Sequence, residues 1–153
     1  MNIRLAKTDD AAAISAMMYA LAEKYVVPDF PVSAANALLV SMLPEGVRKH
    51  LRGGCRYHVA ESDGQIVGVI GIKDNKHLYH LFVSEAHQRK GVARNLWQTA
   101  ITVCRASGYQ GEFTVNSSVH TQMMYEKLGF VAQPPSRVRD GVTTIPMVLT
   151  PTR

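Results

Sequence analysis

The stretch Gln88-Arg89-Lys90-Gly91-Val92-Ala93 decides the fold of this chain, because it joins an apolar run at 78–83 to an amphipathic helical pattern. A helix leaves its first four amides without internal partners, and its aligned peptide dipoles put positive charge at that end. Gly91 lets the backbone turn and approach a ligand closely, while Arg89 and Lys90 add positive charge. The six residues together therefore predict a phosphate-binding loop at a helix N-terminus.

Neither common nucleotide-binding pattern, G-x-x-x-x-G-K-[ST] or G-x-G-x-x-G, occurs in the sequence. The loop instead resembles the [Q/R]-x-x-G-x-[G/A] phosphate loop of the GNAT acetyltransferase superfamily. A second match lies downstream, where Tyr125-Glu126-Lys127-Leu128-Gly129-Phe130 fits the Y-x-K-x-G-F helix end that this family usually carries. The resemblance covers residues 55–150, and its two motifs occur in the family's order.

The resemblance implies an acetyl-CoA-dependent N-acetyltransferase, which moves an acetyl group to a primary amine by direct attack in a ternary complex. Acetyl-CoA is the expected co-substrate, and residues 88–93 are expected to bind its phosphates. Backbone groups of Leu81, Phe82 and Val83 are expected to contact the acetyl oxygen and the pantetheine arm. Asn116 and Ser118 are further candidates for cofactor contacts, although helix capping alone explains Ser118.

Two side chains are candidates for proton transfer. Tyr125 has an ordinary pKa of about 10, which suits a thiolate leaving group, and similarity to the family makes it the expected general acid. In the family that the chain resembles, many members use a carboxylate on the strand before the loop, where this chain has His77 and His80. His77 is closer to the family's acidic position, so we predict that it is the base or part of a water relay, with Glu112 as the fallback.

The apolar periodicity predicts a single domain over 1–153 with the order β-α-α-β-β-β-α-β-α-β-β. This is an α/β fold of the α+β type, with a mixed, largely antiparallel central sheet and helices on both faces. Asp63-Gly64 predicts a hairpin, and a second Asp-Gly pair lies at 140–141. Thr8 and Ser118 are expected to cap helices.

The strand, helix and strand around the loop favour a parallel strand pair with a right-handed crossover. In the fold that the resemblance implies, the strand that carries 81–83 and the strand that ends at Asn116 splay apart. The gap is expected to expose backbone groups against which the pantetheine arm pairs.

The composition is that of an ordinary globular protein, with 46% hydrophobic and 19% charged residues. Cys55 and Cys104 show no metal-binding spacing, so we expect no metal and two free thiols. No cysteine has a base nearby in the sequence, which disfavours a covalent acetyl-enzyme. No apolar run approaches the ~20 residues of a membrane span and no signal-peptide pattern is present, so we expect a cytoplasmic protein without membrane contact.

A net charge of +5 makes nucleic acid one candidate partner. However, the positive residues are scattered, and binding of a polyanionic cofactor suffices to explain the positive charge. Two alternatives stay open: a CoA-binding sensor or regulatory domain without turnover, and an acetyltransferase for a nucleic-acid-linked amine such as charged tRNA. The acceptor is undetermined among small amines, peptide N-termini and lysine side chains, and its specificity is expected in 24–54 and 133–142. A homodimer also stays open.

Overall fold

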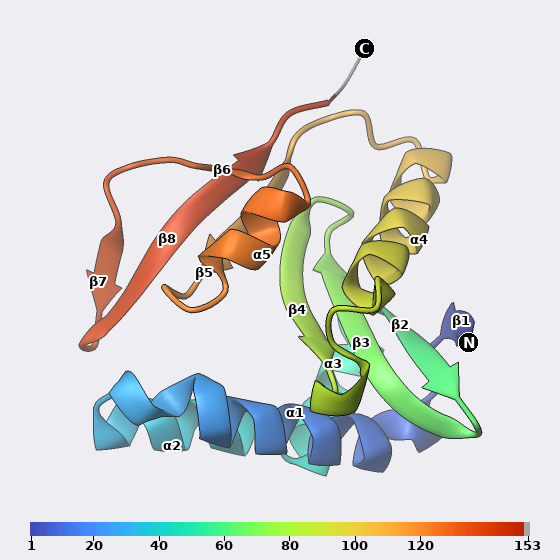
Figure 1. Ribbon diagram of the computed structural model, residues 1–153, viewed down its shortest axis with the longest axis horizontal. Helices are drawn as coiled ribbons and strands as arrows, with labels where there is room; N and C mark the ends of the chain where they lie inside the picture. Colours follow the sequence, from blue (N-terminus) through green and yellow to red (C-terminus); the bar gives the residue numbers. More distant parts are fainter. Residues whose placement is uncertain (152–153) are drawn as a thin grey trace.

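The computed structural model describes residues 1–151 as one mixed sheet with helices packed on both faces (Figure 1). The helices are α1 (Ala11–Tyr25), α2 (Val32–Ser41), α3 (Pro44–Arg52), α4 (Val92–Ala106) and α5 (Gln122–Lys127). The strands are β1 (Asn2–Leu5), β2 (Cys55–Ser62), β3 (Gln65–Lys73), β4 (His77–Val83), β5 (Phe113–Ser117), β6 (Val131–Ala132), β7 (Arg137–Arg139) and β8 (Val142–Leu149). No helix among these residues is long and apolar enough to cross a membrane.

The strands lie in the order β1-β2-β3-β4-β5-β8-β6, and β7 pairs separately with β8. Every pair is antiparallel except β4 with β5, which is parallel and is connected through α4. The predicted fold class is confirmed, and the element order differs from the predicted one in two places. Three helices rather than two lie between β1 and β2, because Pro44 begins the separate helix α3, and β7 adds one short strand before the last strand. The hairpin of β7 and β8 turns at Asp140-Gly141, where both residues have positive φ values of 52° and 76°.

The central feature of the sheet is the short contact between β4 and β5. They pair at His77 with Thr114 and at Leu78 with Val115, after which the strands separate. On the other side of β4, Gly71 of β3 pairs with His80, while the next residue of β3 pairs with Leu78. Tyr79 is therefore the extra residue of a β-bulge, which bends β4 at the point where it leaves β5.

Two hydrophobic clusters cover the two faces of the sheet. On one face, α1 and α3 pack over Tyr57, Val59 and Val69, and on the other, α4 and α5 pack over Ile70, Leu81 and their neighbours. These residues alternate along β2, β3 and β4, as expected for strands that are buried on both sides.

Two glycines of β3 let bulky groups come close to the backbone. A Cβ at Gly68 would lie 3.0 Å from Leu96 of α4, and a Cβ at Gly71 would lie only 2.3 Å from the Tyr57 ring. The missing side chains at these positions therefore set how closely α4 and Tyr57 approach the sheet.

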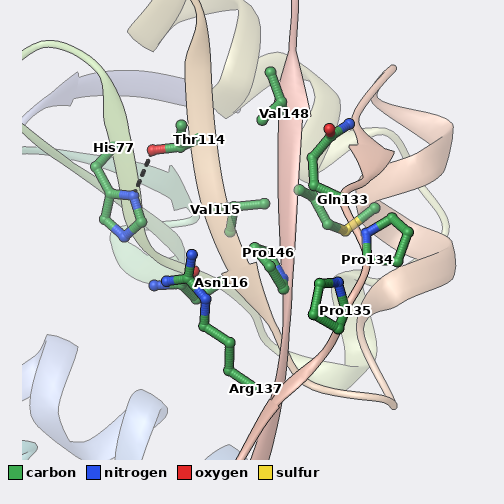
Figure 2. Close-up of a pocket in the computed structure, with 11 residues that line it drawn as sticks. His77, Thr114, Val115, Asn116, Gln133, Pro134, Pro135, Arg137, Pro146 and Val148 are labelled. Carbon is green, nitrogen blue, oxygen red and sulfur yellow. Dashed lines mark hydrogen bonds between the residues drawn. The ribbon is translucent and has the colours of Figure 1, made fainter.

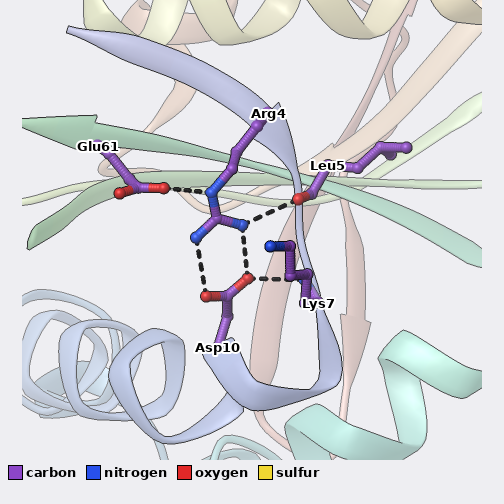
Figure 3. Close-up of polar contacts among 5 residues, drawn as sticks. All are labelled: Arg4, Leu5, Lys7, Asp10 and Glu61. Atoms are coloured by element: carbon purple, nitrogen blue, oxygen red, sulfur yellow. Dashed lines mark hydrogen bonds and ion pairs between the residues drawn. The ribbon is translucent and has the colours of Figure 1, made fainter. Parts of the chain in front are cut away.

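The predicted cap at Thr8 is wrong. Thr8–Asp10 forms a 3-10 turn before α1, and the Asp10 carboxylate accepts a hydrogen bond from the Lys7 amide at 2.6 Å (Figure 3). The same carboxylate binds the Arg4 guanidinium at 2.8 and 2.9 Å, and Arg4 also pairs with Glu61. These contacts hold the pKa of Asp10 below its usual value and attach the start of α1 to β1 and β2.

The predicted cap at Ser118 is also wrong, because α5 begins at Gln122 after Thr121. Ser118 instead closes the preceding turn, where its hydroxyl lies 2.9 Å from the Thr121 hydroxyl. The predicted helix end is confirmed: Gly129 has a φ of 106°, and the Phe130 amide donates to the Tyr125 carbonyl at 3.0 Å. This bond is the C-terminal cap that a left-handed glycine permits.

Candidate active site

The loop from Gln88 to Gly91 makes a tight turn between β4 and α4. The Gln88 side-chain amide donates to the Val83 carbonyl at 2.9 Å, which fixes the loop to the end of the strand. Arg89 and Gly91 both have left-handed backbones, with φ values of 63° and 82°. The turn therefore brings the chain into α4 with Gly91 at the N-cap.

The N-terminus of α4 has the properties of an anion site. A Cβ at Gly91 would meet no atom within 4 Å, so the space before its amide is open to a ligand. The amides of the first helical turn have no intrahelical partner, and the helix dipole adds positive charge there. Arg89 and Lys90 are exposed beside this turn, whereas Val92 is buried and Ala93 half-buried. The residues present fit a phosphate-bearing cofactor.

The edge of β4 that faces β5 is the second part of this region. Leu81, Phe82 and Val83 pair with β3 on one side, and their other side lies beyond the last contact with β5. The Leu81 and Val83 side chains are buried in the cluster beneath α4. A ligand at this edge would therefore meet mainly backbone groups.

Tyr125 lies in the same hydrophobic cluster as Leu81, Val83 and Val92, so its ring is on the same side of the sheet as the start of α4. The side chain is 6% exposed, and burial raises the pKa of its hydroxyl above the usual value. The hydroxyl therefore stays protonated at neutral pH, as a hydrogen-bond donor must. The two helices are also joined directly, since the Arg94 guanidinium donates to the Lys127 carbonyl at 3.2 Å.

His77 lies where β4 still pairs with β5. Its Nδ1 is 2.7 Å from the Thr114 hydroxyl, and its other ring nitrogen points away from Thr114 (Figure 2). Burial lowers the pKa of His77, and the charges of Lys73 and Lys76 lower it further. The imidazole is therefore neutral at pH 7 and able to accept a proton.

His77 and Thr114 line a pocket of about 590 Å³ together with residues of β5, β8 and the segment that follows β6 (Figure 2). Its floor comes from β5 and β8, and the segment that leads into β7 forms a wall. Its other hydrogen-bonding side chains are those of Asn116, Gln133 and Arg137, and prolines 134, 135 and 146 supply apolar surface. The geometry thus places a neutral imidazole in a half-open pocket beside the gap between β4 and β5.

Comparison with known proteins agrees with this geometry. A family model described as an acetyltransferase (GNAT) domain matches residues 26–151. This chain belongs to the GNAT acetyltransferase family. The family identification from the two sequence motifs is therefore confirmed.

Individual relatives support the fold of this GNAT domain. N-acetyltransferase 8 from Homo sapiens is 31% identical over 90 residues, which cover 52% of this chain and 39% of that protein. The chain thus spans well under half the length of this curated relative. A GCN5-related N-acetyltransferase from Rhodopseudomonas palustris has a TM-score of 0.82 at 21% identity, covering 97% of this chain and 94% of that one. PaiA N-acetyltransferase from Thermoplasma acidophilum, solved in complex with coenzyme A, has a TM-score of 0.78 at 16% identity. The match covers 98% of this chain and 99% of that one.

The predicted site residues of this GNAT domain fall into two groups on opposite faces of the sheet. Tyr125 and the loop lie with the cluster beneath α4 and α5, whereas His77 alternates with the buried Leu78 and faces the other side. Asn116 lies with His77 in the pocket, not beside the loop, and Ser118 lies in the turn after β5. Glu112 is exposed before β5 and does not line the pocket.

His80 of the GNAT domain is buried. The Tyr57 hydroxyl lies 2.8 Å from its Nδ1, and the Tyr79 ring stacks on it with centroids 4.4 Å apart. Burial lowers the pKa of His80 to about 3 and raises that of Tyr57, so the imidazole is neutral and the phenol donates to it. This contact joins β2 to the bulge of β4 and so supports the bend at the gap.

Sequence reasoning missed Arg137 and Thr114. Arg137 falls within the 133–142 stretch expected to set acceptor specificity, but no motif singled it out. No sequence pattern pointed to Thr114, because its contact with His77 joins two strands and spans 37 residues of the chain.

Proposed function

We propose that this protein is an acetyl-CoA-dependent N-acetyltransferase, which transfers the acetyl group to a primary amine by direct attack in a ternary complex. The main support for the proposal is that β4 separates from β5 directly before the loop that leads into α4. The space before Gly91 in this loop is open to a ligand. Bound acetyl-CoA supplies an activated acetyl thioester. The acceptor supplies the amine, and the groups that bind the thioester and move the protons come from the chain.

Cofactor binding is assigned to the loop and the β4 edge. The amides of residues 89–93, with the charges of Arg89 and Lys90, would hold the pyrophosphate. The backbone of Leu81, Phe82 and Val83 would bind the pantetheine arm as an added strand and stabilise negative charge on the acetyl oxygen. The coenzyme A bound by the Thermoplasma acidophilum neighbour of the same fold supports this assignment.

Proton removal from the amine is assigned to His77. A primary amine has a pKa of about 10.4 and is mostly protonated at pH 7, so a base must act directly or through water. His77 is neutral there and lines the pocket beside the gap. Thr114, through its contact with Nδ1, would hold the ring in place so that Nε2 accepts the proton.

Protonation of the leaving sulfur is assigned to Tyr125. Its hydroxyl stays protonated because burial raises its pKa, and its ring lies in the hydrophobic cluster that also contains Leu81 and Val83 of β4. Tyr125 and His77 lie on opposite faces of the sheet, so the amine and the thiol would approach the gap from opposite sides. This arrangement suits a single displacement.

The two cysteines offer no better route. Burial raises the pKa of both the Cys55 and the Cys104 thiol, which keeps them protonated and weakly nucleophilic. Cys104 is in the core, and neither thiol lines the pocket with His77. A covalent acetyl-enzyme is therefore disfavoured.

The test is a panel of amines and peptides incubated with acetyl-CoA, with thiol release followed by a thiol reagent and acetylated products identified by mass spectrometry. Amine-dependent thiol release is expected, with one acetyl group gained by the amine. Saturable acetyl-CoA binding without turnover on any amine would instead favour the CoA-binding sensor. Salt-sensitive binding of charged tRNA in a gel shift, with acetylation of its amine, would favour the nucleic-acid alternative.

A further inference from the structure

We infer that the acceptor is a primary amine that also carries a carboxylate, and that Arg137 binds this carboxylate in the pocket lined by His77. The inference rests on the proposed N-acetyltransferase function and names the substrate class of the same site. It is carried by the charges in and around the pocket.

Arg137 is held at the pocket wall by the β7 and β8 hairpin, where it pairs with Thr144 (Figure 2). None of the hydrogen bonds or ion pairs formed within residues 1–151 uses its guanidinium, whereas Arg4 and Arg48 both pair with carboxylates. Guanidinium groups bind carboxylates through two parallel hydrogen bonds. Arg137 is thus available to bind an anionic ligand group.

The remaining pocket contains no negative charge to oppose an anion. Among the side chains that line it, all from the described part of the chain, Arg137 alone is charged at pH 7, because His77 is neutral. Lys73 and Lys76 lie close enough to lower the pKa of His77, so their positive charge also reaches this region. A polyamine or a lysine-rich peptide would meet repulsion here, whereas an amine with a carboxylate is neutral overall.

The positive surroundings also help the chemistry. They disfavour the protonated ammonium form of an acceptor beside His77, as they disfavour protonated His77 itself. The carboxylate at Arg137 would hold the acceptor against this repulsion. The prolines at 134, 135 and 146 give the pocket apolar surface, which suits an acceptor with an apolar side chain.

The test compares L-leucine and L-phenylalanine with their primary amides, their decarboxylated amines and spermidine. The two amino acids should give the highest kcat/KM, although the amides have the lower amine pKa and therefore the larger unprotonated fraction at neutral pH. Arg137→Gln should lower kcat/KM for the amino acids by roughly 10- to 100-fold, as expected for losing a hydrogen bond to a charged group, and should leave the amides unchanged. The matched control is Arg139→Gln, two residues along β7 and outside the pocket lining, which should behave as wild type.

A preference for amides, decarboxylated amines or spermidine would overturn the inference, as would equal losses in both arginine variants. If no amine is acetylated, the proposed function fails, and binding decides the inference separately. N-acetyl-L-phenylalanine, titrated in the presence of coenzyme A and followed by NMR, should then perturb wild type and Arg139→Gln but not Arg137→Gln. Equal binding to all three, or no binding to any, would overturn it.

Discussion

The Nδ1 atom of His77 and the hydroxyl of Thr114 lie 2.7 Å apart, at one of the two residue pairs that join β4 to β5. The contact orients the imidazole at the point where the sheet begins to open. It leaves the second ring nitrogen free of Thr114 (Figure 2). The position of this imidazole is therefore set by strand pairing, and any change to that pairing should alter the chemistry of the pocket.

Replacing His77 by Ala should lower kcat/KM by roughly 100-fold near neutral pH, as expected for loss of a general base. The loss should shrink at higher pH, where more of the amine is already neutral. In wild type, the pKa of His77 is lowered, so activity should persist as the pH falls to 6.5 and decline only below it. Full pH–rate profiles check this.

Thr114→Val is the companion variant, since it keeps the imidazole and removes its hydrogen-bond partner. A smaller loss than for His77→Ala is expected. A His77→Ala profile identical to that of wild type would show that His77 is only a structural residue of the strand.

Replacing Gly91 by Asp should weaken acetyl-CoA binding by roughly 10- to 100-fold, because a carboxylate would stand against the phosphates at short range. Folding should be preserved, since this chain already holds Asp63, Asp74 and Asp140 at positive φ and a Cβ at Gly91 would meet no atom within 4 Å. Calorimetric titration measures the affinity. Gly64→Asp is the matched control: it has a similar φ of 77° and open surroundings but lies in the β2–β3 hairpin. Unchanged affinity in a folded Gly91→Asp protein would refute the phosphate loop.

Replacing Tyr125 by Phe should lower kcat by roughly 10- to 1,000-fold, as expected for loss of a general acid, with acetyl-CoA affinity little changed. The ring and its packing on Phe130 are kept, so the melting temperature should stay near that of wild type. Steady-state kinetics on any accepted amine measure this. Tyr109→Phe is the contrasting control, because its hydroxyl donates to the Glu112 carbonyl, and its loss should affect stability more than kcat. An unaltered kcat in Tyr125→Phe, with the chemical step rate-limiting, would show that Tyr125 is only an aromatic residue of the core.

Folding stability should fall as the pH drops below 6.5, in part because of His80. Burial lowers its pKa to about 3 in the folded protein, whereas the unfolded chain has the ordinary value of about 6.5. Between these values the unfolded state binds a proton that the folded state does not, so the free energy of unfolding decreases as the pH decreases. The effect is absent above pH 6.5. One such site contributes at most about 1.4 kcal/mol per pH unit.

His80→Gln keeps an acceptor for the Tyr57 hydroxyl and should flatten the dependence of melting temperature on pH between 7 and 5. Circular dichroism at several pH values measures both the variant and the wild type. Equal slopes in the two proteins would contradict a neutral buried His80.

Short sequence patterns predicted much of the fold. The Asp63-Gly64 pair adopts positive φ values of 52° and 77°, as its hairpin requires, and Gly129 ends α5 in the expected left-handed conformation. The loop at 88–93 occurs between the strand and helix that the sequence predicted. Such features depend on neighbours a few residues away, so residue type is enough to indicate them. The two predicted capping side chains, Thr8 and Ser118, were wrong, because a 3-10 turn or a hydroxyl-mediated turn satisfies the same backbone groups.

By itself, the sequence determined the family, most of the order of elements and the position of the loop before α4, and it made Tyr125 and His77 candidate site residues. Each of these follows from a short pattern and its flanking periodicity. Only the tertiary structure decided which face each side chain occupies. The bulge at Tyr79, the contact of His77 with Thr114 and the position of Arg137 in their common pocket all depend on strand register between distant segments. A shift of one residue in that register would turn each side chain to the opposite face, and packing of the whole sheet is what fixes it.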